Sequence, residues 1–170
     1  MLRATEILRA GLWNARPADV VRLDYDHRTR RRIALTGTGG LAFLLDLAKT
    51  PVLADGDGLK LEDGRIVAVA AAPERLLRIT CDDERALARI AWHLGNRHLA
   101  TEIETRAVYI REDHVIADMA RGLGAHVRAV ERPFNPEGGA YGQGATQGHS
   151  HGGHHSHGGH HHSHDHDHGH

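Results

Sequence analysis

Apolar and polar side chains alternate in short runs over residues 1–72, which is the period of strands that are buried on one face. The alternation is clearest over residues 21–26, and Ile33 and Leu35 repeat it. The basic stretch 28–32 lies between these two runs, and we interpret it as an exposed hairpin tip whose arginines are solvated.

A second hairpin is predicted where Asp63 and Gly64 separate the apolar runs 59–61 and 66–69. The run 41–48 is apolar except for one aspartate, so its periodicity fits either a buried strand or a helical turn. These short strands together predict a small all-β domain over residues 1–72.

The pattern changes to helical spacing in the next segment, 73–144. Apolar residues recur every three or four positions from Ala86 to Leu94. Asp82 is placed to cap the start of this helix, and Gly95 suits the left-handed position that follows a helix end.

A second helix repeats this pattern over residues 115–123, with Asp113 as its cap and Gly124 as its end. Strand candidates flank both helices, at 76–81, 100–104, 107–110 and 127–130. The order is β-α-β-β-α-β, which predicts a ferredoxin-like domain with two helices on one face of an antiparallel sheet. The fold class expected for the chain is therefore α+β.

Composition separates a third zone, residues 145–170, in which glycine, serine and histidine dominate. The chain has 17 histidines, and most of them lie in this zone. A segment with so few apolar side chains buries too little surface to offset chain entropy, so we expect a disordered His-rich tail in the absence of metal.

Neutral imidazole is a borderline-soft nitrogen ligand for nickel, zinc and copper. We therefore expect the tail to bind Ni(II), and Zn(II) or Cu(II) in vitro, with affinity falling as pH drops through about 6.5. An affinity tag or a solubilising tail fits less well, because the histidines are spaced by Gly, Ser and Asp. The candidate ligands are His149, His151, His154, His155, His157, His160, His161, His162, His164, His166, His168 and His170.

Charge and cysteine content exclude several classes of protein. The net charge is -1 with neutral His, which argues against a nucleic-acid-binding protein. The single cysteine, Cys81, excludes an intramolecular disulfide framework and a multi-thiolate zinc site, and its place at a strand end predicts a buried, unreactive thiol. There is no membrane-spanning run and no secretory signal, so we expect a cytoplasmic protein.

Five histidines precede the tail, and two of them are candidate metal ligands. His98 follows the first helix, and His114 lies in the first turn of the second, where the helix dipole disfavours imidazolium. His27, His93 and His126 are interpreted as structural or exposed. One histidine makes a poor metal site, but a twofold axis would pair it with its copy, and twofold dimers are the commonest oligomers.

The chain closely resembles the UreE family of urease accessory proteins, which are nickel chaperones. The resemblance is carried by WHLGNRHLATEIE (92–104), YIREDHVIADMARGLGA (109–125) and FNPEGGAYG (134–142), with LADGDGLKLEDGRIVAVAAAPERLLRI before them. It extends over residues 1–145. The three motifs are specific as a set, although each alone is weak.

This resemblance implies a β domain similar to peptide-binding modules over 1–72, and a metal-binding, dimer-forming domain over 73–144. It implies that His98 from each chain binds nickel at the dimer interface and that His114 matches a second family histidine. Some members have further histidines at positions 110–112, which this chain lacks. The implied partners are the urease apoprotein and a GTPase of its maturation machinery.

The function expected is capture and delivery of nickel for the urease metallocentre, without catalysis. A nickel or zinc storage protein is the main alternative, and it would place nearly all metal in the tail. A metal-dependent hydrolase would need three fixed ligands and an open position, which the motifs outside the tail do not supply. A pure interaction module would bind its partner through residues 1–72, with metal incidental.

Overall fold

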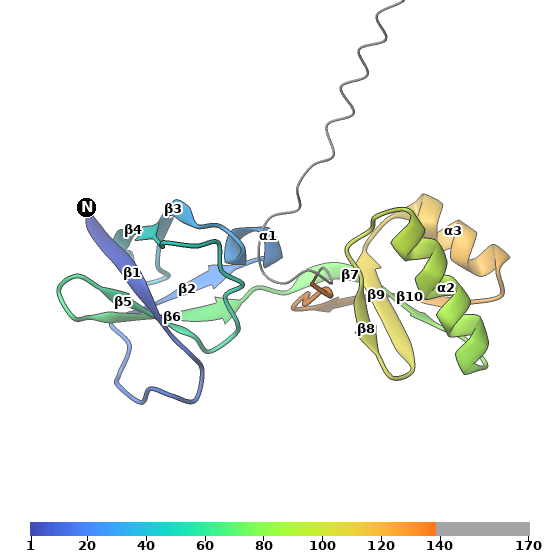
Figure 1. Cartoon of the computed structure of the whole chain (residues 1–170), viewed down its shortest axis with the longest axis horizontal. Helices are drawn as coiled ribbons and strands as arrows, with labels where there is room; N and C mark the ends of the chain where they lie inside the picture. Colours follow the sequence, from blue (N-terminus) through green and yellow to red (C-terminus); the bar gives the residue numbers. More distant parts are fainter. Residues whose placement is uncertain (139–170) are drawn as a thin grey trace, which may run out of the picture.

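A computed structural model describes residues 1–138, which form two domains that lie side by side and are linked by residues 72–73 (Figure 1). The predicted His-rich tail, 145–170, lies outside these described residues. No helix within residues 1–138 is long and apolar enough to cross a membrane.

The N-terminal domain is a six-stranded sheet in the order β2-β6-β5-β1-β4-β3. Its apolar side chains meet in one core that includes Val21, Phe43, Leu45 and Val67. Residues 1–72, predicted as an all-β domain, consist of these strands and one helical turn. The run 41–48, whose pattern fitted a strand or a helical turn, contains a strand. The strands are β1 (Leu2–Leu8), β2 (Asp19–Leu23), β3 (Arg32–Thr36), β4 (Ala42–Asp46), β5 (Gly58–Leu61) and β6 (Ile66–Ala71).

The predicted hairpin tip at 28–32 is wrong. A single helical turn, α1 (Tyr25–Arg28), follows β2, and the Asp24 side chain caps it by accepting a hydrogen bond from the His27 N–H. Only 1% of Arg28 is exposed, so one of the arginines assigned to a solvated tip is instead part of the interior.

The C-terminal domain has the element order β-α-β-β-α-β and the sheet order β10-β7-β9-β8. Apolar side chains from both helices share one core with strand residues such as Leu77, Ile79, Val108 and Ile110, so both helices cover the same face of the sheet. The elements are β7 (Glu74–Thr80), α2 (Glu84–Asn96), β8 (Glu102–Glu104), β9 (Ala107–Arg111), α3 (His114–Gly122) and β10 (His126–Arg132).

The two domains are joined by a packed junction. The Phe134 ring is fully buried and meets the Tyr25 ring edge-on, with centroids 5.9 Å apart. The Arg28 guanidinium donates to the carbonyls of Leu53 and Phe134 and to the Asn135 side chain, so it joins the N-terminal domain to the segment after β10. This segment therefore runs back from the C-terminal domain onto the first domain.

Candidate metal centre

The end of α2 places His98 in an uncommon backbone conformation. The helix continues through Gly95 to Asn96, so the predicted helix end at Gly95 is wrong. The N–H of His98 bonds to the Gly95 carbonyl and that of Leu99 to the Leu94 carbonyl, which is the Schellman pattern of a helix end. His98 occupies the left-handed position of this motif, with φ 56°.

The end of α3 shows what usually fills that position. There Gly124 has φ 86°, and the N–H groups of Gly124 and Ala125 bond to the carbonyls of Arg121 and Ala120 in the same pattern. Glycine adopts this conformation without a Cβ clash, whereas another L-residue loses roughly 1–2 kcal/mol. The two helices therefore end alike, but α2 has a strained histidine where α3 has glycine.

The start of α3 brings His114 to the same end of the domain. Asp113 caps the helix by accepting hydrogen bonds from the N–H groups of Val115 and Ile116, as the sequence predicted. Because β8 and β9 are antiparallel, with Glu102 opposite Tyr109, the loop before β8 and the loop after β9 lie at the same end of these two strands. Figure 1 shows the end of α2 and the start of α3 at this end of the sheet.

Large apolar side chains are exposed on these two helices. Trp92 in α2 is 63% exposed and Val115 in α3 is 61% exposed. The Trp92 ring meets the His93 ring edge-on at 5.0 Å between centroids. Val115 lies within the apolar helical pattern predicted over residues 115–123, but it is not on the buried face of α3. Its neighbour Ile116 is buried, and adjacent helix positions point about 100° apart.

The chain leading to the tail is attached next to the His98 loop. The Glu137 N–H bonds to the Thr101 carbonyl at 2.8 Å, and the Asn135 N–H bonds to the Glu102 carboxylate. Thr101 is three residues from His98, so the root of the tail is fixed near the candidate ligand. Sequence reasoning missed this contact, since neither residue belongs to a metal-ligand pattern.

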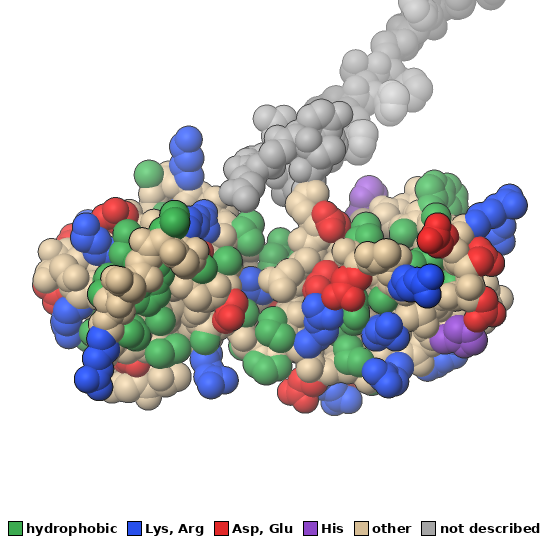
Figure 2. All heavy atoms as spheres, turned by 90° about the horizontal axis from the view of Figure 1, so that it is seen from below, with side chains coloured by type: hydrophobic (Ala, Val, Ile, Leu, Met, Phe, Trp, Pro, Cys, Tyr) green, Lys and Arg blue, Asp and Glu red, His purple; other side chains and the backbone are tan. Residues whose placement is uncertain are grey.

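Two of the other described histidines, His27 and His126, have acidic partners away from His98. His27 pairs with Asp24 in the N-terminal domain, and His126 pairs with Asp82 at the far end of β10. The histidines visible on the face drawn in Figure 2 lie over the C-terminal domain, separated from one another. Within residues 1–138, no three His, Cys, Asp or Glu side chains are grouped so that they could hold a metal ion. The twelve tail histidines lie outside the described residues.

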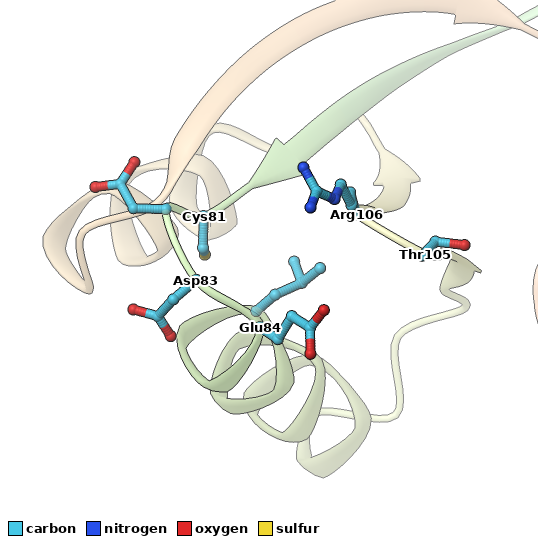
Figure 3. Close-up of a pocket in the computed structure, with 7 residues that line it drawn as sticks. Cys81, Asp83, Glu84, Thr105 and Arg106 are labelled. Atoms are coloured by element: carbon cyan, nitrogen blue, oxygen red, sulfur yellow. The ribbon is translucent and has the colours of Figure 1, made fainter.

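Cys81 lines a small pocket of about 100 Å³ with Asp83, Glu84, Thr105 and Arg106, next to the start of α2 (Figure 3). The thiol is half-buried rather than fully buried as predicted. Burial raises its pKa, and the nearby Asp83 and Asp82 carboxylates raise it further. The 13 residues of α2 separate this pocket from the His98 loop by about 20 Å.

We expect Cys81 to react slowly with iodoacetamide at pH 7, because the thiolate is the nucleophile and its fraction is reduced by the raised pKa. The rate should stay below that of free cysteine and climb as pH rises past the ordinary thiol pKa. Mass spectrometry of the alkylated protein measures this at a single site, because the chain has one cysteine. A rate equal to that of free cysteine at pH 7 would contradict the described environment.

Both domains match models of known families. The model described as "UreE urease accessory protein, N-terminal domain" matches residues 4–72, and the corresponding C-terminal domain model matches residues 74–170. Similar curated proteins named "Urease accessory protein UreE" support this match. The one from Bradyrhizobium sp. (strain BTAi1) is 55% identical over 88% of this chain and 73% of its own length. Those from Beijerinckia indica and Rhodobacter capsulatus are 52% and 46% identical, each over 89% of this chain and over 87% and 94% of their own lengths.

Proposed function

This chain belongs to the UreE family of urease accessory proteins, and from that premise we propose that it binds Ni(II) and delivers it for assembly of the urease metallocentre. Membership gives it a role in urease maturation; it is an accessory protein, not itself a urease. The C-terminal domain is assigned to the ferredoxin-like class, which its β10-β7-β9-β8 order supports.

A homodimer with His98 from each chain at the interface is the arrangement that we propose for nickel binding. The observation that carries it is that His98 is exposed and left-handed at the end of α2, a helix that also exposes Trp92, while α3 exposes Val115. A second copy packed over these helices would bury the apolar surface and pair the imidazoles. One chain's residues 1–138 hold no complete set of ligands, so the paired site needs its copy.

The tail acts as the capture arm in this proposal. Its first histidine, His149, follows the described end at Gly138 by 11 residues, a stretch that can reach at most about 40 Å. Because Glu137 is held at Thr101, near His98, this reach lets tail imidazoles exchange nickel with the paired site. Zn(II) and Cu(II) would compete in vitro, because imidazole does not select strongly among these ions.

Nickel then passes to the urease apoprotein with a maturation GTPase as the receiving partner, in the cytoplasm. Open sites of few ligands release metal more readily than closed tetrahedral ones, which favours transfer over retention. A storage protein is the alternative that the twelve tail histidines favour, since they could hold several ions without any interface site.

Nickel titration by calorimetry separates delivery from storage. A chain ended after Gly144 should bind one tight Ni(II) per dimer, and His98→Ala should abolish this binding. His126→Ala is the matched control, because His126 is also exposed but pairs with Asp82 at the opposite end of the domain. Absence of a tight site from the shortened chain would move the function into the tail and favour storage.

A further inference from the structure

The segment after β10, residues 133–138, contacts both domains and is drawn in orange between them in Figure 1; we call it the strap. The buried Phe134 ring meets the Tyr25 ring edge-on. The Arg28 side chain donates hydrogen bonds to the Phe134 carbonyl and to the Asn135 side-chain oxygen. Because Tyr25 and Arg28 belong to α1, these contacts fix the first half of the strap to the N-terminal domain.

The second half of the strap is fixed beside His98. The Asn135 N–H bonds to the Glu102 carboxylate and the Glu137 N–H to the Thr101 carbonyl, both at 2.8 Å. Thr101 is the last residue of the loop between α2 and β8, which also carries His98. One short segment therefore links a helix of the N-terminal domain to the loop that carries the candidate nickel ligand.

The Glu102 carboxylate is a rigid support for the strap. Only 7% of Glu102 is exposed, and the Arg132 guanidinium donates to its other oxygen at 2.8 Å. Arg132 also pairs with Glu104 at 2.9 Å and lies over the Tyr109 ring, 4.4 Å from its centroid. These partners belong to the C-terminal sheet, so the sheet holds Glu102 independently of the strap.

The Arg28 guanidinium holds the strap at a cost in free energy. The side chain is buried, and its acceptors, which include the Leu53 carbonyl, are neutral oxygens. Its Nε has no hydrogen-bond partner among residues 1–138. A buried charge that is compensated by neutral groups, with one N–H unpaired, loses hydration that an exposed guanidinium keeps. Lifting the strap returns this hydration, which brings a released state closer in free energy to the docked one.

We propose that the strap makes nickel binding at His98 depend on the contact between the two domains, an inference that rests on the proposed function. When docked, the strap fixes Thr101 and the root of the tail beside His98. When the strap is released, both lose this support, so the imidazoles are no longer preorganised for the metal. Arg28 and Asn135 are therefore positioning residues for nickel binding, although neither supplies a ligand.

This dependence would let the receiving partner trigger the release of nickel. A nickel chaperone has to retain the metal in transit and give it up at the partner. A partner that separates α1 from the strap would undock it, and nickel binding would weaken only where transfer takes place. Coupling is reciprocal, so nickel should favour the docked strap by the same factor by which release of the strap weakens nickel binding.

Two substitutions at Asn135 are expected to change nickel release in opposite directions. Asn135 is exposed, and its N–H to Glu102 survives either change. Asn135→Ala removes an acceptor of Arg28 and should raise the nickel dissociation rate at least threefold. Asn135→Asp places a carboxylate where the neutral oxygen lies, 3.1 Å from the guanidinium nitrogen, and should lower the rate at least threefold. Damage to the fold explains faster release but not slower release.

The dissociation rate is measured on the full chain, loaded with one Ni(II) per two chains and mixed with an excess of the chelator 4-(2-pyridylazo)resorcinol, which changes colour as it binds nickel. Arg28→Ala should raise this rate at least tenfold, because it removes both hydrogen bonds from Arg28 to the strap. Arg30→Ala is the matched control, since Arg30 is exposed, and its rate should stay within twofold of the original chain. If Arg28→Ala does not fold, the two Asn135 variants decide the question.

Hydrogen exchange followed by mass spectrometry measures the reciprocal effect. Nickel should slow exchange at least threefold in the peptide that contains the Asn135 and Glu137 amides. His98→Ala is the control, because its nickel is held by the tail alone and should leave this exchange unchanged. Equal slowing in His98→Ala would show that nickel in the tail protects the strap directly, which contradicts coupling through His98.

Equal dissociation rates in the original chain and both Asn135 variants would overturn the proposal, and so would faster release from Asn135→Asp. Failure of the proposed function has a different signature. Nickel would then leave the original chain and His98→Ala at the same rate, which would overturn nickel binding at His98 together with its control by the strap. Slower release from the original chain than from His98→Ala, with no effect of the Asn135 substitutions, would overturn the control alone.

Discussion

Arg28→Ala is expected to lower the free energy of unfolding by about 3–5 kcal/mol, since three acceptors at the domain junction lose their donor. These acceptors are the carbonyls of Leu53 and Phe134 and the side chain of Asn135. The change also leaves a cavity beneath the Tyr25 ring, which the guanidinium carbon approaches to 5.6 Å from its centroid. Urea unfolding followed by circular dichroism measures the loss.

The same variant should also uncouple the two domains. Arg28 is the buried side chain that joins α1 to the segment after β10, while the Arg111 ion pairs with Asp26 and Glu74 are more exposed and worth less. We therefore expect one calorimetric unfolding transition in the original chain and two in Arg28→Ala. Arg30→Ala is the control from the same basic stretch, and because Arg30 is exposed it should change stability by less than about 0.5 kcal/mol. A single, unshifted transition in Arg28→Ala would contradict this role of the junction.

Arg28 also marks a limit of prediction from sequence. The alternation before and after it correctly indicates β2 and β3, because the period of two follows from one-sided burial. Whether the residues between two strands form a turn or a helical turn depends on what they contact. Here the contacts come from Phe134 and Asn135, more than 100 residues later, and local pattern holds no information about them.

The elements of the C-terminal domain were easier to predict from the sequence, because each of its helices has both an apolar face and a cap. Asp113 was identified as a cap since a carboxylate before an apolar period satisfies the first free N–H groups. For α2 the cap lies one residue later than predicted, at Asp83, because either of two adjacent aspartates could serve. The β-α-β-β-α-β order then follows from the succession of these elements.

The sequence selects His98 as a candidate ligand, but it does not predict the backbone conformation of this residue. His98 is a candidate ligand because it follows a helix and matches a family motif. The preference for glycine after helix ends predicted that Gly95, and not His98, takes the left-handed position. The structure has Gly95 inside α2 and the strained position at His98. Local sequence does not show this, because Leu94 and Leu99, which flank this helix end, pack in a core formed with residues distant in the sequence.

His98→Gly is expected to make the chain more stable and, at the same time, to abolish the tight nickel binding that we propose for His98. Glycine adopts φ 56° without the Cβ clash, so the folded state should gain roughly 1 kcal/mol. His98→Ala keeps that clash and should lose nickel without gaining stability. The difference between the two variants therefore isolates the strain from the loss of the imidazole.

Unfolding in urea without metal, alongside nickel calorimetry, measures both effects in one series. The matched control is Gly124→Ala, which puts a Cβ into the same position at the end of α3, where nothing lies within 4 Å of it, and should destabilise by roughly 1 kcal/mol. If His98→Gly and His98→Ala were equally stable, the left-handed conformation of His98 would carry no strain. If His98→Gly kept the tight site, nickel would be held by other ligands. The expected outcome, higher stability with lost binding, means that the fold gives up stability at this position to keep an imidazole at the end of α2.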